Sequence, residues 1–426
     1  MKRLICVLMI FIMAFSLCAC SDSIMHSDAN LKKNFERSEN VPTYDFLSEE
    51  HTTPENYEKY TEGSIDFAIK LLAENMQEGE NTVVSPVSAS AVLSTLALGA
   101  GGKTSSEIRN AIASGTSTDV ISTGTHYLFS RLTAFNSEEG YFKSANSLWF
   151  DNRFDVKSSF LQSCTNYYDT DIFRIDFTEV DAADKVNCWV NEKTNSEITN
   201  IIDSTEGACT IAINTALMED AWATPYDELQ MSKGTFSGAK GDTEAEFMSS
   251  NEFYVSTAYA EGFVKGFKNV PCKFMALLPK EDENIADFVN NLSVGRLTAI
   301  IDSQAPMERC VAKLPVFSVE SDLELTESLK AMGINTMFDA EKADFSNLSN
   351  AGQVYISEVN QKAFVEVGPQ GAKAGAATSA VLAYGVSPSE DVVEFKELTF
   401  DRPFVFVIYD NESNVPAFIG VVNNVD

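Results

Sequence analysis

The chain has 426 residues, of which 44 % are hydrophobic, so it can bury a sizeable core. Acidic residues outnumber basic ones by 62 to 31, and the net charge of −31 argues against binding to nucleic-acid phosphates or to an anionic membrane surface. There are three histidines, and two of them, His26 and His51, precede the first periodic segment. A zinc site or a hydrolase triad would have to be built on His126, which argues against both.

The first residues have the pattern of an export signal. Lys-Arg at positions 2 and 3 precedes an apolar run over residues 4–17 that is too short to span a membrane comfortably. The run ends in Leu-Cys-Ala-Cys20, which resembles the cleavage box of bacterial lipoproteins. We therefore predict a lipoprotein signal peptide over residues 1–19, with lipidation of Cys20. The protein is then extracytoplasmic, lipid-anchored at the cell surface or secreted. An ordinary secretory signal is the alternative.

Residues 20–55 are polar and show little periodicity, which favours a solvated tether. The remaining residues, 56–426, are predicted to form one large domain. Apolar periodicity predicts helices over residues 64–76, 87–100, 186–202 and 323–332. Short apolar segments predict strands over residues 81–84, 144–150, 172–177, 211–218, 253–258, 274–278, 311–319, 404–408 and 417–422. Helices come first and strands later, without β-α-β alternation, and this order predicts an α+β fold.

The cysteines beyond the export signal do not indicate a metal or redox site. They are odd in number and none has CxxC spacing: Cys164, Cys188, Cys209, Cys272 and Cys310. We expect most of them to be buried apolar side chains, which is the commoner role of a free cysteine. No cofactor and no metal are predicted.

Six segments of the domain form a recognisable series. They are Asn81-Thr-Val-Val-Ser85-Pro86-Val-Ser88, Asn146-Ser-Leu-Trp149-Phe150, Val186-Asn187-Cys-Trp189-Val190, Ile213-Asn214-Thr-Ala-Leu with Trp222, Lys313-Leu-Pro315-Val-Phe317 with the residues to Ser346, and Asp401-Arg402-Pro403-Phe404. In this order the segments resemble the serpin family of serine protease inhibitors. The resemblance implies helices packed around a large, mainly antiparallel central sheet, with two further sheets and an exposed reactive loop.

The resemblance also assigns roles to several residues. Asn81, Ser85, Pro86 and Ser88 look like the shutter, the region under the centre of the main sheet. Trp222 looks like part of the breach, the upper end of that sheet. Two departures from the family stand out. Met218-Glu219-Asp220 replaces the usual aromatic-Lys-Gly before the tryptophan, and Gln361 replaces a shutter histidine. Glutamine can also donate and accept hydrogen bonds, so the shutter network can survive without a pH-sensitive member.

The segment over about residues 369–398 corresponds to the reactive loop. Taken alone, its small residues suggest a flexible linker; in a serpin, a target protease cleaves this loop, becomes acylated, and the loop inserts into the main sheet. If Gly371 is the hinge glycine, strand alternation turns one set of side chains towards the sheet interior, all of them small and uncharged: Ala372, Ala374, Ala376 and Thr378. Lys373 and Ala377 fall on the outer face. Pro369-Gln370 stands where the family has acids, and Pro369 lacks an amide proton for insertion.

Family spacing from the hinge glycine places the reactive bond at Tyr384-Gly385, although the loop is longer than usual. Neither arginine nor lysine lies between Lys373 and Lys396, which favours a chymotrypsin-, elastase- or subtilisin-like protease over a trypsin-like one. The resemblance thus implies an irreversible, suicide-type inhibitor that is not an enzyme, acts as a monomer, and contacts the membrane only through its lipid. The alternative is a non-inhibitory serpin that serves as a binding or surface protein.

Overall fold

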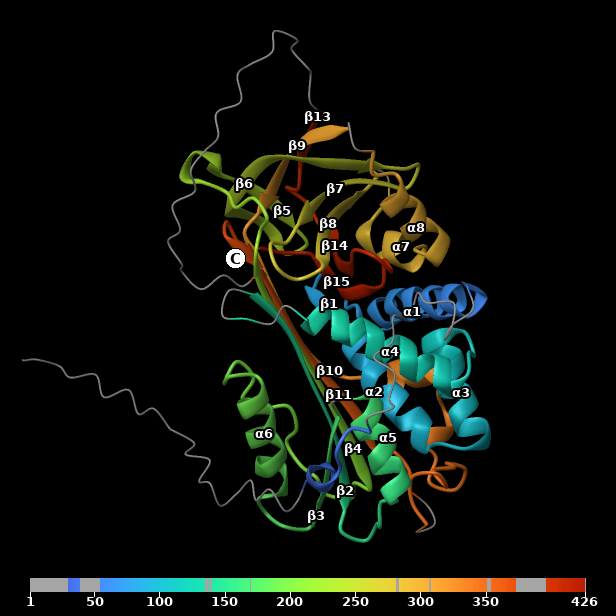
Figure 1. The fold of residues 1–426 in the computed structure, drawn as a ribbon. Coiled ribbons are helices and arrows are strands. Elements are labelled where there is room, and N and C mark those ends of the chain that lie inside the picture. Colours follow the sequence, from blue (N-terminus) through green and yellow to red (C-terminus); the bar gives the residue numbers. More distant parts are fainter. Residues whose placement is uncertain are drawn as a thin grey trace, which may run out of the picture.

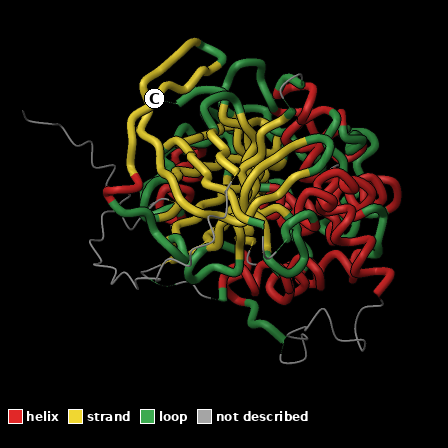
Figure 2. Tube along the Cα trace, turned by 90° about the horizontal axis from the view of Figure 1, so that it is seen from above, coloured by secondary structure: helices red, strands yellow, loops and turns green. Residues whose placement is uncertain are grey.

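The computed structural model describes residues 30–38, 54–134, 137, 140–168, 170–280, 283–305, 308–350, 354–372 and 396–425. Two sheets and a set of helices make up this part of the chain (Figure 1). Viewed from above, most of the helices gather on one side of the strands (Figure 2). The predicted α+β class is confirmed.

The first sheet has six strands and forms the long axis of the molecule. Its order is β10 (Phe317–Glu324), β11 (Glu358–Val367), β12 (Gly371–Ala372), β4 (Thr210–Ala221), β2 (Gly140–Asp151) and β3 (Thr170–Ile175). Most neighbours are antiparallel, whereas β11 pairs with β4, and β2 with β3, in parallel. Helix α6 (Ala182–Lys193) covers one face of the sheet, and α2 (Pro86–Gly99) lies on the other (Figure 1).

The second sheet is continuous, whereas the resemblance implied two further sheets. Its path is β1 (Thr82–Val84), β15 (Pro416–Val422), β14 (Phe404–Asp410), β8 (Cys272–Pro279), β7 (Ala260–Gly266), β6 (Gly241–Ser256), β9 (Arg309–Pro315) and β13 (Lys396–Thr399), with β5 (Met231–Gly238) on β6. The 16-residue strand β6 holds this sheet together, because it pairs with β5 along its first half, with β9 over Phe247–Phe253 and with β7 over Phe253–Ser256.

The central helix α2 is buried on nearly every side, as its uninterrupted apolar sequence predicts. Pro86 starts it at the first helical turn, where a missing N–H costs nothing. The remaining helices are α1 (Pro54–Asn75), α3 (Gly102–Ala113), α4 (Thr118–Thr133), α5 (Ser158–Tyr167), α7 (Ile285–Asn290), α8 (Val294–Asp302) and α9 (Thr326–Ala331). None of the helices in the described ranges is long and apolar enough to cross a bilayer.

Three predicted elements differ from the structure. The helix expected over 186–202 ends at Lys193, because the Thr194 hydroxyl bonds the Val190 carbonyl and accepts from the Ile198 amide, and the next two residues have positive φ. The helix expected over 323–332 is shorter, since β10 continues to Glu324 and α9 covers only Thr326–Ala331. The strand expected over 311–319 is two strands in different sheets, β9 and β10.

One β-α-β unit interrupts the predicted order of helices first and strands later. Strands β2 and β3 are parallel neighbours and α5 connects them. Parallel neighbours need a crossover, and a helix supplies it here. Three strands, β1, β2 and β3, therefore lie among the first six helices.

Part of the predicted tether lies against the domain. Residues 30–38 contain the short 3-10 helix η1 (Leu31–Asn34), and Asn30 forms a bridge with Phe173 of β3. The Ser38 amide donates 3.1 Å to Asn166, and Gln162 donates 2.9 Å to the Glu36 carbonyl. This segment therefore packs on β3 and α5.

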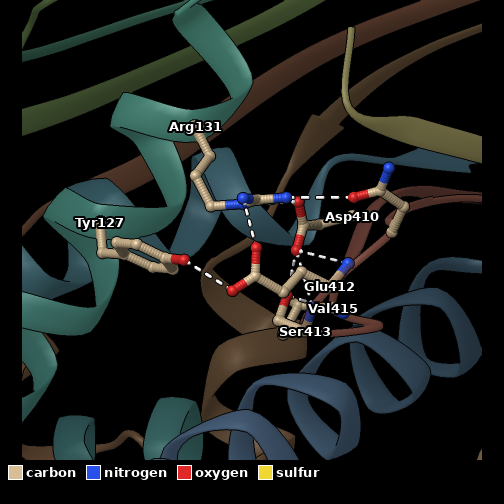
Figure 3. A network of polar contacts seen from close by, with 7 residues as sticks. Tyr127, Arg131, Asp410, Glu412, Ser413 and Val415 are labelled. Carbon is tan, nitrogen blue, oxygen red and sulfur yellow. Dashed lines mark hydrogen bonds and ion pairs between the residues drawn. The ribbon is translucent and has the colours of Figure 1, made fainter. Parts of the chain in front are cut away.

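A polar network ties α4 to the β14–β15 hairpin (Figure 3). The Arg131 Nε donates 3.1 Å to the fully buried Asp410 carboxylate, and Arg131 also pairs with Glu412. Tyr127 donates 2.8 Å to Glu412, and the Ser413 amide and hydroxyl each donate 2.8 Å to Asp410. The buried carboxylate thus has a cation and several N–H or O–H donors, which offset its desolvation.

Candidate functional site

The two-residue strand β12 occupies only the upper end of the seam between β11 and β4. It is antiparallel to both: Ala372 lies opposite Val367 of β11 and opposite Asp220 of β4. Below it, β11 and β4 pair directly and in parallel over Glu358–Phe364 and Ile211–Leu217. A strand continuing from β12 would have to separate this parallel pair.

The two residues of β12 are suited to close packing. A side chain on Gly371 would bring its Cβ to 2.0 Å from the Asp220 carbonyl oxygen, so this position needs glycine. Ala372 is 1 % exposed, on the inner face as strand alternation predicts. The first residue of the predicted inward set is therefore already seated in the sheet.

The turn that leads into β12, which we call the hinge turn (Gly368–Gly371), is fixed by hydrogen bonds. Gly368 and Gly371 exchange two bonds of 3.0 and 3.3 Å across Pro369-Gln370. The indole of Trp222 donates 2.9 Å to the Gly368 carbonyl, and the Trp222 amide donates 2.8 Å to the Gln370 carbonyl. Pro369 thus stands in a turn, where its lack of an N–H has no cost.

A buried ion pair supports this turn and was not found from the sequence. Lys265 of β7 and Glu252 of β6 are 4 % and 7 % exposed and pair with each other. The Lys265 ammonium lies 4.4 Å from the ring centre of Tyr226, whose amide donates 2.9 Å to the Pro369 carbonyl. Burial lowers the pKa of Lys265 although Glu252 opposes the shift. The two residues lie on different strands, 13 positions apart, so no local sequence pattern predicts the pair.

Asp220, one of the departures from the family pattern, has a structural role. Its side chain is buried and accepts hydrogen bonds of 2.8 and 2.7 Å from the amides of Asn269 and Val270. The backbone of Asp220 pairs with Ala372. Asp220 therefore links the hinge to the loop that follows β7.

At mid-sheet, a row of buried amides crosses three neighbouring strands; we call it the amide row (Gln361 of β11, Asn214 of β4, Asn146 of β2). Gln361 donates to the Asn214 side chain, which donates to Asn146. The side-chain oxygen of Gln361 also accepts a 3.0 Å hydrogen bond from the Ser85 amide, and the side-chain NH₂ donates a 3.0 Å bond to the Ser85 backbone carbonyl. Every polar atom of the Gln361 side chain thus has a partner, and one of its bonds spans the β11–β4 seam.

The other residues assigned to the shutter lie near this row but differ in their contacts. The Ser85 hydroxyl donates 2.8 Å to the Ala417 carbonyl, which joins the start of α2 to β15. The buried Ser88 hydroxyl has no hydrogen-bond partner within the described ranges. Asn81 instead holds the chain end: it donates 2.9 Å to the Asn424 carbonyl and accepts 2.7 Å from the Asn423 amide.

The remaining predicted site residues lie outside the described ranges: Cys20, Ala374, Ala376, Ala377, Thr378, Tyr384 and Gly385. Residues 373–395 connect β12 in the six-stranded sheet to β13 at the end of the other sheet. The connection therefore runs from one sheet to the other.

The described residues around His126 do not form a catalytic triad. Its Nε2 lies 2.6 Å from Arg37, and its Nδ1 lies 3.2 Å from the Tyr167 carbonyl rather than near a carboxylate. The Ser130 hydroxyl is 3.5 Å away. Burial, and then the charge of Arg37, lower the pKa of His126.

The five cysteines are buried: Cys164, Cys188, Cys209, Cys272 and Cys310. All but one are free thiols, as the sequence predicts for most of them, whereas Cys188 is disulfide-bonded. Burial raises the pKa of the Cys310 thiol to about 12, and it also raises those of Cys164, Cys209 and Cys272. Thiols held protonated are poor nucleophiles and poor metal ligands. Within the described part of the chain, no group of three or more His, Cys, Asp or Glu side chains could hold a metal ion.

Comparisons with known proteins agree with this architecture. The profile of the family described as "Serpin (serine protease inhibitor)" matches residues 62–425. An uncharacterised serpin-like protein of Methanosarcina acetivorans is 29 % identical over 367 residues, which cover 84 % of this chain and 85 % of that protein. Intracellular coagulation inhibitor 2 of Tachypleus tridentatus is 26 % identical over 368 residues, which cover 84 % of this chain and 88 % of that protein.

The solved structure of a thermophilic serpin, tengpin, in its native state superposes with a TM-score of 0.82 at 30 % identity, covering 93 % of this chain and 99 % of tengpin. The fold, with its seated β12 and the amide row beneath it, is thus that of a serpin. The chain belongs to the serpin family. Members of this family are generally not enzymes themselves but inhibitors that act on target proteases.

Proposed function

We propose that this serpin is an irreversible, suicide-type inhibitor of serine proteases of the chymotrypsin, elastase or subtilisin type. The target cleaves the loop over residues 369–398 at about Tyr384-Gly385 and is held as an acyl-enzyme while the loop inserts between β11 and β4. The observation that carries the proposal is the seated β12, because its register defines the path of the loop.

The small inward residues fit this path. Extending the antiparallel register from Ala372 brings Ala374 opposite Val365 and Met218, and Ala376 opposite Ala363 and Ala216. All four of these partners are buried. A side chain larger than alanine would have to displace the packed core at these positions, which costs stability.

The same register brings Thr378 opposite both Gln361 and Asn214. Insertion would break the hydrogen bond between these two amides, and a buried unpaired amide is costly. The hydroxyl of Thr378, which can donate and accept, would replace that bond. Thr378 is the polar member of the predicted inward set, and it falls at the amide row.

The outward-facing residue Lys373 is also compatible with insertion of the loop. Lys373 would come to lie opposite Glu366 and Glu219, so its ammonium would pair with two carboxylates. Insertion would also replace one parallel pairing by two antiparallel ones, which are slightly more stable per residue. Both effects favour the inserted form.

The name of the Tachypleus relative, a coagulation inhibitor, supports inhibition, and the apolar residues around Tyr384 support the target class. We further propose that the protein acts as a monomer and is held outside the cytoplasm by a lipid on Cys20. No cofactor enters the mechanism.

The test is incubation with chymotrypsin, elastase and subtilisin. We expect an SDS-stable band at the combined mass of protease and inhibitor. The variant Ala374→Arg would have to bury an unpaired charge during insertion and should be cleaved at the same bond without forming the band. Simple cleavage of the unaltered protein by all three proteases would favour the alternative, a non-inhibitory serpin that binds another molecule.

A further inference from the structure

A cavity of about 570 Å³ opens beside the six-stranded sheet, away from the hinge. It lies between α4, the C-terminal end of α5, α6 and the free edge of β2, because β3 begins only opposite Asn146 and leaves Lys143–Ala145 uncovered. The segment 30–38 forms part of the wall. Its apolar lining consists of Ala91, Phe129, Phe142, Ala145 and Trp189. The volume falls in the range of small-molecule sites.

The charge of the lining is opposite to that of the chain. Four cationic side chains face the cavity, namely Lys32, Arg37, Lys143 and Lys193, together with one carboxylate, Asp171. The chain as a whole carries twice as many acids as bases. A positive cavity on such a chain is a local feature that the overall composition does not explain.

The single carboxylate is already paired. Asp171 lies 2.9 Å from the Lys193 ammonium and accepts 3.0 Å bonds from Trp189 and Asn30. Burial would raise the pKa of Asp171, but Lys193 and these hydrogen bonds lower it overall, so the group stays ionised. Asp171 therefore offsets the charge of Lys193.

Arg37 and Lys143 differ from Lys193 in this respect. Within the described part of the chain, neither has a carboxylate at ion-pairing distance. The Lys143 ammonium lies 4.3 Å from the ring centre of Tyr141. Arg37 donates to His126, whose Nδ1 must carry the ring proton because it faces the Tyr167 carbonyl. The lowered pKa keeps His126 neutral, so it orients Arg37 without adding or cancelling charge.

We propose that this cavity binds a small amphipathic anion. Its acidic group, a carboxylate or sulfonate, pairs with Lys143 and Arg37, and its apolar body packs on Phe129 and Ala145, which are both partly exposed. The proposal does not depend on protease inhibition. Asn146 lines the cavity and also belongs to the amide row, so a bound ligand contacts the sheet that the loop would enter.

The probe pair is 1-anilinonaphthalene-8-sulfonate and N-phenyl-1-naphthylamine, which have the same aromatic body with and without the anionic group. Fluorescence titration of the mature protein should give saturable one-to-one binding of the sulfonate. Lys143→Gln and Arg37→Gln should each weaken it about tenfold, a loss typical of one charge-assisted contact. Lys233→Gln, a change at an exposed lysine of β5 paired with Glu244, is the matched control and should leave binding unchanged.

Binding of the neutral amine should be the same in all four proteins, and weaker than that of the sulfonate. Unchanged melting temperatures would show that the variants are folded. The proposal is overturned if the sulfonate shows no saturable binding, if both probes bind alike, or if Lys143→Gln and Arg37→Gln have no more effect than Lys233→Gln.

Discussion

The indole N–H of Trp222 donates a 2.9 Å hydrogen bond to the carbonyl oxygen of Gly368, the first residue of the hinge turn. The ring itself is fully buried and stacks on Phe267 with 4.8 Å between the ring centres. A side chain of the sheet thus holds the start of the reactive loop in place. The strength of this hydrogen bond therefore affects how readily the upper end of the seam between β11 and β4 opens.

Trp222→Phe keeps the aromatic stack but removes the donor to Gly368. We expect a loss of about 1–2 kcal/mol, the usual cost of a deleted buried hydrogen bond. Hydrogen exchange at the Gly371 amide, which bonds back to Gly368, should become about tenfold faster. Trp189→Phe, which removes a donor to Asp171 far from the hinge, is the control. Equal exchange at Gly371 in both variants would contradict the role given to Trp222.

Gln361→Glu tests the amide row. At neutral pH a carboxylate can still accept from Ser85 but cannot donate to the Ser85 carbonyl or to Asn214. The buried charge and two unpaired acceptors should lower the free energy of unfolding by at least about 3 kcal/mol. Urea denaturation measures the loss.

The matched control for that change is Gln230→Glu. The Gln230 side-chain oxygen accepts 2.8 Å from the Asp227 amide, and a carboxylate can do the same. This variant should stay within about 0.5 kcal/mol of the parent protein, as most surface changes do. If both variants were equally stable, Gln361 would not carry the donor role described above.

The amide row and the hinge differ in how far the sequence predicts them. Alternation along an extended strand is enough to turn Ala372 inwards, and the structure has it 1 % exposed. The resemblance singles out Ser85 and Gln361, and the structure joins them by two hydrogen bonds. Asn81 was grouped with them although it binds the chain end, because adjacency in sequence does not decide which partner a side chain meets.

Other features could not be predicted, for physical reasons. The Lys265–Glu252 pair depends on two strands lying side by side. The local sequence around each residue does not distinguish it from an exposed charged residue. The end of α6 depends on the hydroxyl of Thr194 competing for the backbone, against the apolar periodicity that continues to Ile202. Long-range pairing and local side-chain competition are what periodicity leaves out.

His126 should make stability depend on pH. Its folded-state pKa is lowered, so below its ordinary value of about 6.5 the unfolded chain binds a proton that the folded chain does not. Its contribution is therefore complete above about pH 6.5 and is lost as the pH falls towards the folded-state pKa. His126→Gln should reduce the loss of stability between pH 7.5 and 5.5, measured by urea denaturation at both values. An equal loss in both proteins would contradict this.

The proposed lipid anchor is tested with Cys20→Ala. The parent protein, expressed in a bacterium that processes lipoproteins, should fractionate with membranes and carry a lipid mass on Cys20. The variant should be released or remain an unprocessed precursor, because the lipid attachment site is gone. Cys164→Ala, a change at a buried thiol of α5, is the control and should fractionate like the parent. Identical fractionation of the Cys20→Ala variant, with no lipid on the parent, would refute the anchor.

Thr378→Val tests the inserted form directly. Valine has nearly the shape of threonine but no hydroxyl, so Gln361 and Asn214 would be left without a partner after insertion. We expect a larger share of the protein to be cleaved without trapping the protease, and the cleaved protein to melt at a lower temperature. Thr378→Ser keeps the hydroxyl and should behave like the parent. If valine and threonine give the same ratio of covalent complex to cleaved protein and the same melting temperature, the loop does not insert in the register defined by Ala372.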